Sequence, residues 1–430
     1  MRARIVAVVC GLAVSIALAT PERAAAQARS LTLDEAIDMA LQVQPGMVQA
    51  RGQVTSAHAS RLQTYGNWLP SVSVGSGFSS NSTSRFDPAT QRTVSGSATS
   101  YSTNLNASIV VFDGLSRVYD VRAAGADAAA ADASLINQRF QTSLQTKQTF
   151  FNALAAEELV RVSGNRIERA QEQLKVAKEK LLNGTATRSD TLRSTVEVAN
   201  ARLQKLNAET QLATAEAVLA RLAGVEGRVK AQPEERLLTV AEIDTAAIRE
   251  EALGGSPLIR QAAAQAGAAA ASYAASFSQY LPSVTASYSR SWAGSEFSEL
   301  DPSWSARVSV SLPLFNGFTR ELNRTHSAVN RDNARAQAED VRRQVNAQLT
   351  QHLAALASAR ARLEIALANR AASEEDLRVQ RERYRVGAAT IVDVLASQVN
   401  LDQAEVDIVQ ARLDYQVARA QIEALVGREL

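Results

Sequence analysis

The stretch SWSARVSVS at residues 303–311 alternates polar and apolar side chains along its whole length. A period of two residues is typical of a β-strand with one apolar and one polar face. The same alternation runs through residues 71–79, 101–111 and 283–292. Each segment has about ten residues, the length that a tilted strand needs to cross a bilayer.

The polar face of these segments distinguishes them from strands of a soluble sheet. A soluble antiparallel sheet also alternates, but its solvated face normally carries Lys and Glu. Here the polar positions are almost all Ser, Thr, Asn and Gly, which suits the wet interior of a barrel. Arg307 is an exception on the polar face, whereas Arg290 has the parity of the apolar face. We therefore favour transmembrane strands, with a soluble sheet as the alternative.

Large aromatic residues mark the ends of the predicted strands, as the girdles of a membrane barrel require. They are Trp68, Phe112, Tyr280, Trp292, Trp304 and Phe315. Four strands cannot close a barrel, and an open sheet edge in lipid would leave backbone groups without hydrogen bonds. The chain must therefore oligomerise. Two copies would give eight strands and three would give twelve, and the strand pattern does not choose between them.

The chain repeats one plan twice. Residues 68–72 match residues 280–284 at an offset of 212, and Phe112, Gly114 and Arg117 match Phe315, Gly317 and Arg320 at an offset of 203. The difference of nine residues predicts a longer surface loop between residues 72 and 112. The first repeat, 29–230, is predicted to contain a helical region at 32–66, strands at 69–80 and 98–112, and helices at 115–182 and 188–223. The second repeat, 231–430, is predicted to contain a helical region at 240–278, strands at 281–293 and 302–314, and helices at 318–385 and 390–427.

Long helices dominate the prediction. No proline occurs after Pro313 or between Pro88 and Pro233, and residues 317–385 alone would span about 100 Å as a helix. Leucines in this stretch follow alternating spacings of four and three residues, which is typical of a coiled coil. The helix at 390–427 carries two such seams, so it needs neighbours on both sides. A helix in the wall of a tubular helical barrel has neighbours of this kind.

The N-terminus has the features of a secretory signal peptide over residues 1–28. Arg2 and Arg4 precede an apolar run at residues 5–19, and small residues at Ala26 and Ala28 allow cleavage after either one. Cys10, the only cysteine, lies inside this leader, so no disulfide framework is expected in the mature chain.

Charge and composition exclude several classes of function. The chain has 46 Lys and Arg against 44 Asp and Glu, and loss of the leader would leave 43 of each, which argues against a nucleic-acid partner. The three histidines are scattered without metal-ligand spacing, and no HExxH, Walker or GxSxG motif is present. We expect no catalytic site, no metal and no cofactor.

The mature chain resembles the TolC-like outer membrane efflux protein family over nearly its whole length. The most specific match is YRVGAATIVDVL at residues 384–395, supported by Leu-Pro-Ser at 69–71 and 281–283 and by ALVG at 424–427. The resemblance implies an α+β membrane protein that trimerises into a 12-stranded barrel continuous with a 12-helix periplasmic barrel. It also implies a location in the outer membrane of a Gram-negative bacterium, a periplasmic adaptor and an inner-membrane transporter as partners, and no enzymatic activity.

The resemblance assigns roles to two groups of residues. Asp393 and Tyr384 match the periplasmic constriction and gate. The adaptor-docking helix tips match Asn183, Gly184, Thr185, Val386, Gly387 and Ala388. Ala389 and Ala396 replace an arginine and a second aspartate that the best-known member carries there. The residues also allow simpler roles, because Thr390 and Asp393 have capping-box spacing and both glycines can end helices.

Three functions remain to be separated. The first is the exit duct of a tripartite efflux pump that passively conducts small molecules, with type I protein secretion as an alternative use of the same duct. The second is a periplasmic coiled-coil scaffold, which explains the helices but not the serine-faced strands. A secreted enzyme is the third, and no nucleophile, base or metal constellation supports it.

Overall fold

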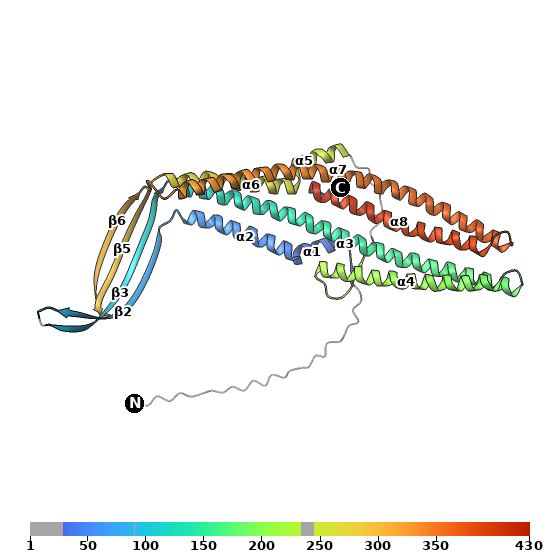
Figure 1. Ribbon diagram of the computed structural model, residues 1–430, viewed down its shortest axis with the longest axis horizontal. Helices are drawn as coiled ribbons and strands as arrows, with labels where there is room; N and C mark the ends of the chain where they lie inside the picture. The colour runs from blue at the N-terminus through green and yellow to red at the C-terminus, as the bar shows by residue number, and fades with distance from the viewer. Residues whose placement is uncertain (1–28, 90, 234–244) are drawn as a thin grey trace, which may run out of the picture.

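The computed structural model describes residues 29–89, 91–233 and 245–430. The predicted leader with Ala26 and Ala28, and the first five residues of the helical region at 240–278, lie outside these ranges. Figure 1 shows a long molecule with a β-sheet at one end and two helical hairpins reaching the other. The C-terminus lies midway along the helices.

The sheet has four antiparallel strands in the order β2-β3-β5-β6. They are β2 (Ser71–Asp87), β3 (Arg92–Asp113), β5 (Ser283–Glu296) and β6 (Glu299–Ser311). The register aligns Val74, Leu105, Arg290 and Trp304 in one row and Ser71, Ser108, Ser287 and Arg307 in another. Cross-strand partners share a face. The sheet therefore has one apolar face and one hydroxyl face, as the alternation predicts.

The first two strands run further than the predicted 69–80 and 98–112. Their pairing continues without a break from Ser71 with Ser108 to Asp87 with Arg92, so the longer hairpin absorbs the nine extra residues expected in a loop. Continuous backbone pairing between β2 and β3 keeps this extension in strand geometry although it has few apolar residues. In the second repeat the strands cover 283–296 and 299–311 instead of 281–293 and 302–314.

Two helical hairpins of equal size follow the two pairs of strands. Helices α3 (Ser116–Leu182) and α7 (Thr319–Arg385) have 67 residues each, and α4 (Arg188–Ala223) and α8 (Ile391–Val426) have 36 each. These bounds lie within one residue of the predicted ones. None of the described helices is apolar enough over a sufficient length to span a membrane.

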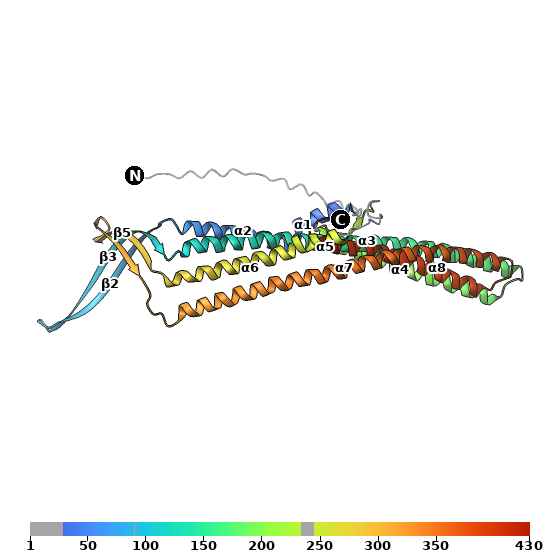
Figure 2. The ribbon, with the colours of Figure 1, turned by 90° about the horizontal axis from the view of Figure 1, so that it is seen from above.

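Shorter helices precede each strand pair and break where proline predicts a break. The first region divides into α1 (Leu33–Val43) and α2 (Pro45–Gly66), and the second into α5 (Thr245–Gly255), α6 (Pro257–Ala275) and the 3₁₀ turn η2 (Ser276–Tyr280). Gln44 and Ser256 are extended, with ψ of 130° and 132°, because a residue before proline is pushed out of the helical region. Figure 2 shows α2 and α6 running beside the long helices toward the sheet.

A small parallel sheet lies midway along the helices and was not predicted. Strand β1 (Arg29–Leu31) pairs with β4 (Val229–Ala231), and both contribute to a buried cluster around Phe150 and Leu219. Three-residue strands are too short for a period of two to be read from the sequence. A second buried cluster joins α5 to α7 and α8 around Val345, Leu349 and Ile422.

Candidate functional site

The turns that end the two helical hairpins lie at the end of the molecule farthest from the sheet (Figures 1 and 2). Gly184 and Gly387 adopt positive φ values of 68° and 83°. In each turn the amide two residues past the helix cap donates to a helix carbonyl at 2.8 Å, Thr185 to Lys180 and Ala388 to Arg383. Both are Schellman turns, in which a glycine is favoured because it has no Cβ.

The six residues predicted at the docking tips are all solvent-exposed: Asn183, Gly184, Thr185, Val386, Gly387 and Ala388. A Cβ added to Gly184 or Gly387 would meet no atom within 4 Å. Leu182 and Val386 are 86% and 71% exposed, so each turn presents an apolar side chain to solvent beside its glycine. These features fit a protein-docking surface, and they do not identify what docks.

Tyr384 joins the two hairpins just above the tips. Its ring is 5% exposed and packs with Leu377 and Ile391. Lys180 of α3 places its ammonium 4.3 Å from the ring centroid and donates to the Tyr384 carbonyl. Burial, followed by the nearby charge of Asp190, raises the pKa of the Tyr384 hydroxyl, which has no hydrogen-bond partner among the described residues. Tyr384 is therefore a contact between the two hairpins, and its gate role stays a prediction.

Asp393 is exposed and caps α8. Its carboxylate accepts hydrogen bonds from the backbone amide and the hydroxyl of Thr390, both at 2.8 Å, and these bonds lower its pKa. Thr187 and Asp190 repeat the same capping box at the start of α4. The capping role inferred from spacing is thus present in both repeats. A pore role for Asp393 depends on the neighbouring copies.

A buried charged network between the hairpins was missed by the sequence analysis. Arg169 of α3 donates to Asp402 at 2.7 Å and to Glu405 at 2.6 Å, both on α8. Arg166 lies 2.9 Å from the second oxygen of Asp402 and 2.7 Å from Glu197 of α4. The sequence contains one signal of this network: Arg166 and Arg169 are three residues apart, and so are the facing acids Asp402 and Glu405.

Burial dominates the electrostatics of this network. It raises the pKa of Asp402, whose carboxylate is 5% exposed, against the opposing effect of Arg169 and Arg166. Burial and the charge of Arg169 together lower the pKa of Arg381, which reaches the same region from α7. Asp402, Glu405 and Glu197 together therefore offset the positive charge that the arginines bring between the helices.

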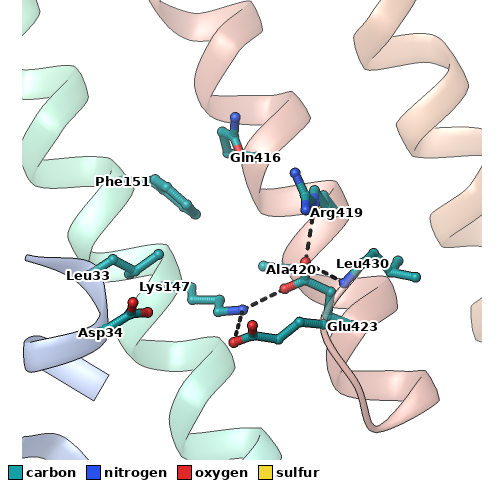
Figure 3. A pocket seen from close by; sticks show the side chains of 10 residues that line it. Leu33, Asp34, Lys147, Phe151, Gln416, Arg419, Ala420, Glu423 and Leu430 are labelled. Atoms are coloured by element: carbon teal, nitrogen blue, oxygen red, sulfur yellow. Dashed lines mark hydrogen bonds and ion pairs between the residues drawn. The ribbon is translucent and has the colours of Figure 1, made fainter. Parts of the chain in front are cut away.

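A second buried ion pair lies midway along the molecule, beside the C-terminus (Figure 3). Lys147 of α3 contacts Glu423 of α8 at 2.6 Å, and the second oxygen of Glu423 accepts from Arg419 at 3.1 Å and from the amide of Leu430 at 3.2 Å. This cluster and the Arg169 network tie α3 to α8 at two levels.

The aromatic residues predicted as girdles fall into two groups. Trp68, Phe112, Tyr280 and Phe315 lie where the sheet meets the helices, whereas Trp292 and Trp304 lie within the sheet on its apolar face. At the junction Arg117 covers the Trp68 ring at 4.7 Å and Arg320 covers the Tyr280 ring at 5.0 Å. Both pairs are repeat equivalents, so the repeat match could have identified the two arginines as positioning residues.

No group of three or more His, Cys, Asp or Glu side chains in the described ranges could hold a metal ion. The arrangement thus offers surfaces for contact and passage: a two-faced sheet, paired long helices and exposed tips.

Comparison with known proteins gives the family. The model of the family described as outer membrane efflux protein matches residues 36–225 and 248–428, and the chain belongs to this family. The resemblance in the sequence is thereby confirmed, together with the outer-membrane location, the efflux function and the expectation that the chain is no enzyme. A search of curated protein sequences finds no match.

Solved structures share the fold at low identity. The outer membrane protein VceC of Vibrio cholerae is 18% identical, with a TM-score of 0.78 over 92% of this chain and 96% of its own. The CmeC outer membrane channel of Campylobacter jejuni is 18% identical, with a TM-score of 0.80 over 92% and 85%. The MtrE outer membrane channel of Neisseria gonorrhoeae, in its open state, is 18% identical, with a TM-score of 0.76 over 92% and 89%.

Proposed function

We propose that this protein is the exit duct of a tripartite efflux pump, a homotrimer that passively conducts small molecules to the cell exterior. The observation that carries the proposal is the sheet, which has one apolar face, one hydroxyl face and two edge strands, β2 and β6, paired on one side only. Three copies would join these edges into twelve strands. The four long helices of each protomer would form a twelve-helix periplasmic tube below them.

The apolar face of the sheet and the exposed helix tips indicate what such a duct would contact. The apolar face with Trp292 and Trp304 would contact outer-membrane lipid. The exposed tips around Gly184 and Gly387 would dock a periplasmic adaptor, and an inner-membrane transporter would supply the energy. The division into repeats at 29–230 and 231–430 is part of this proposal, supported by the two segments of the family match.

Three-fold symmetry would give the tips a gate. Three Asp393 carboxylates brought to the axis would form a cation-attracting ring at the periplasmic constriction. Tyr384 would hold the α7–α8 hairpin against α3 through Lys180 in the same region. Opening would then require loss of contacts between the hairpins of one protomer.

Cysteine cross-linking tests the closure directly. Ser73 of β2 and Ser305 of β6 share one row of the sheet but are separated by β3 and β5, roughly 14 Å at the usual strand spacing. A disulfide cannot bridge that distance within one chain. We expect Ser73→Cys combined with Ser303→Cys, Ser305→Cys or Ser309→Cys to give cross-linked dimers and trimers for at least one pair. Cys10 lies in the predicted leader, so the introduced thiols would be alone.

The mass of the detergent-solubilised particle is the second measurement. Three chains per particle from the outer-membrane fraction, after correction for bound detergent, are the expected result. Single-cysteine variants serve as controls and should give no ladder above a dimer. A soluble monomer or dimer in the periplasm, with no cross-link between the edges, would overturn the duct and favour the coiled-coil scaffold.

A further inference from the structure

Arg307 is the one charged residue on the hydroxyl face of the sheet over the described stretches 71–81, 100–108, 283–291 and 303–311. Its row runs Ser71, Ser108, Ser287 and Arg307 across all four strands. Ser305 and Ser309 flank it on its own strand and face the same way. Over the described stretches 71–81, 100–108, 283–291 and 303–311, the other residues of this face are Ser, Thr, Asn and Gly.

The guanidinium of Arg307 is not neutralised by any described residue of its own chain. The residue is exposed, and no ion pair joins it to another described residue. An arginine is charged at every accessible pH and presents donors that match carboxylate and phosphate groups. Its charge is therefore available to whatever occupies the space on the hydroxyl side of the sheet.

Arg290 and Arg307, the two arginines of the β5–β6 hairpin, lie on opposite faces of the sheet. It lies on the apolar face, opposite Trp304, with its guanidinium 5.1 Å from the centroid of the Trp292 ring. Contact with aromatic rings is the arrangement expected of a cation at a lipid interface. Arg307 lies on the other face, three residues away in register, among hydroxyl groups alone.

We propose that Arg307 forms a cationic ring inside the barrel that favours anionic solutes, those bearing carboxylate or phosphate groups. The inference rests on the proposed function, because closure of three copies turns the hydroxyl face inward and repeats Arg307 at one height. Arg307 lies four residues from Ser311, the helix-side end of β6, or about 13 Å along the strand. Rings of charged side chains set the ion preference of pores in this way. The ring has the opposite sign to the one proposed for Asp393 at the tips.

The test is the reversal potential of purified trimers in planar bilayers under a KCl gradient. We expect Arg307→Gln to lower the chloride-to-potassium permeability ratio by about fivefold near 0.1 M salt, because three charges roughly 10 Å from a passing ion attract chloride and repel potassium by about twofold each. Arg307→Glu should lower it further, and Arg307→Lys should preserve it. The difference should vanish at 1 M salt, where screening shortens the Debye length to about 3 Å.

Arg290→Gln is the matched control, since it removes the same charge from the opposite face and should leave the ratio unchanged. The measurements are repeated in an Asp393→Asn background, so that the effect of Arg307 on the permeability ratio is measured without the carboxylate ring at the tips. Trimers of Arg307→Gln that conduct with an unchanged ratio at low salt would overturn the ring and leave the duct intact. If Arg307→Gln does not assemble, equal ratios for wild type, Arg307→Lys and Arg307→Glu would do the same. Absence of conductance from wild-type trimers would overturn the proposed function and the ring with it.

Discussion

Arg169 of α3 donates a hydrogen bond to Asp402 of α8 at 2.7 Å, across 233 positions of sequence. The other oxygen of the same carboxylate lies 2.9 Å from Arg166. One buried acid therefore holds two guanidiniums of the first hairpin against the second hairpin. The hairpins of a protomer can separate near their tips only if this contact breaks.

Replacing Asp402 should loosen the hairpins without preventing assembly. Asp402→Asn removes the counter-ion that Arg166 and Arg169 share and leaves them with Glu197 and Glu405, so the cost is below the roughly 3–5 kcal/mol of an uncompensated buried charge. The closed arrangement of the tips then loses stability relative to an open one. We expect a larger single-channel conductance in planar bilayers, with the trimer still recovered from the outer membrane.

Asp407→Asn is the control for Asp402→Asn, because Asp407 is exposed on the same helix and accepts a hydrogen bond from Gln403 of its own helix at 2.7 Å. It should conduct like the wild type. The exchange Arg169→Asp with Asp402→Arg should recover part of the closed state. Equal conductance of the Asp402 and Asp407 variants would show that the network does not hold the tips.

A bulky side chain at Gly387 should abolish export and spare assembly. Gly387→Leu places a Cβ in open space, so no clash with the protomer is expected, although its φ of 83° strains any residue but glycine or asparagine. Export is measured as resistance of cells to pump substrates, and assembly as trimer yield. Gly387→Asn, which accepts the turn and adds less bulk, should keep both. Loss of trimer together with export in Gly387→Leu would mean that the glycine is structural only.

Asp393→Asn should weaken the cation preference of the narrow state. The hydrogen bonds from Thr390 lower the pKa of Asp393 below its ordinary value of 3.8, so the carboxylate stays charged at every pH above that value. Because the folded pKa is depressed, the stabilisation by the cap is complete above the ordinary pKa and is lost as pH falls through the folded one. Cation preference of the wild type should therefore persist down to about pH 4. Ion selectivity that is the same in Asp393→Asn and wild type would exclude the pore role and leave the cap.

The parts of the fold in which a hydrophobic period is sustained over many residues were predictable from the sequence. The strand segments, such as residues 303–311, repeat every two residues and the long helices repeat every three to four. The observed bounds of the long helices lie within one residue of the predicted ones. Pro45 and Pro257 set the breaks by removing an amide hydrogen and displacing the residue before them. The extension of β2 and β3 to Asp87 and Arg92 was missed, because Ser, Thr and Asn are also the usual residues of loops.

Contacts between helices far apart in the chain could not be predicted from the sequence. Capping by Thr390 and Asp393 is local, so its spacing alone indicates it. Arg169 and Asp402 each resemble any charged residue of a solvated helix, and only the packing of α3 on α8 makes them partners. The same holds for Lys147 and Glu423, each of which is only 8% exposed, because neither composition nor periodicity indicates that they are buried.

The Lys147 and Glu423 pair should respond unequally to removal of either partner. Lys147→Met leaves Glu423 with Arg419 and the Leu430 amide, so its charge remains compensated. Among the described residues, Glu423→Leu leaves Lys147 with only Glu429, which lies 3.8 Å away and is 80% exposed. We expect the second change to lower the dissociation temperature of the trimer more than the first, with a cost approaching the roughly 3–5 kcal/mol of an unpaired buried charge.

The double variant separates this charge effect from a loss of packing. Lys147→Met combined with Glu423→Leu removes both charges and fills the site with side chains of similar volume, which is often neutral or stabilising for a buried pair. The double variant should therefore have a higher dissociation temperature than Glu423→Leu alone. If the two changes were only packing defects, their costs would add and the dissociation temperature would be lower still. Lys178→Met, on an exposed position of α3, controls for the loss of a positive charge. A double variant that melts below both single variants would mean that shape complementarity, and not the ion pair, holds α3 to α8 at this level.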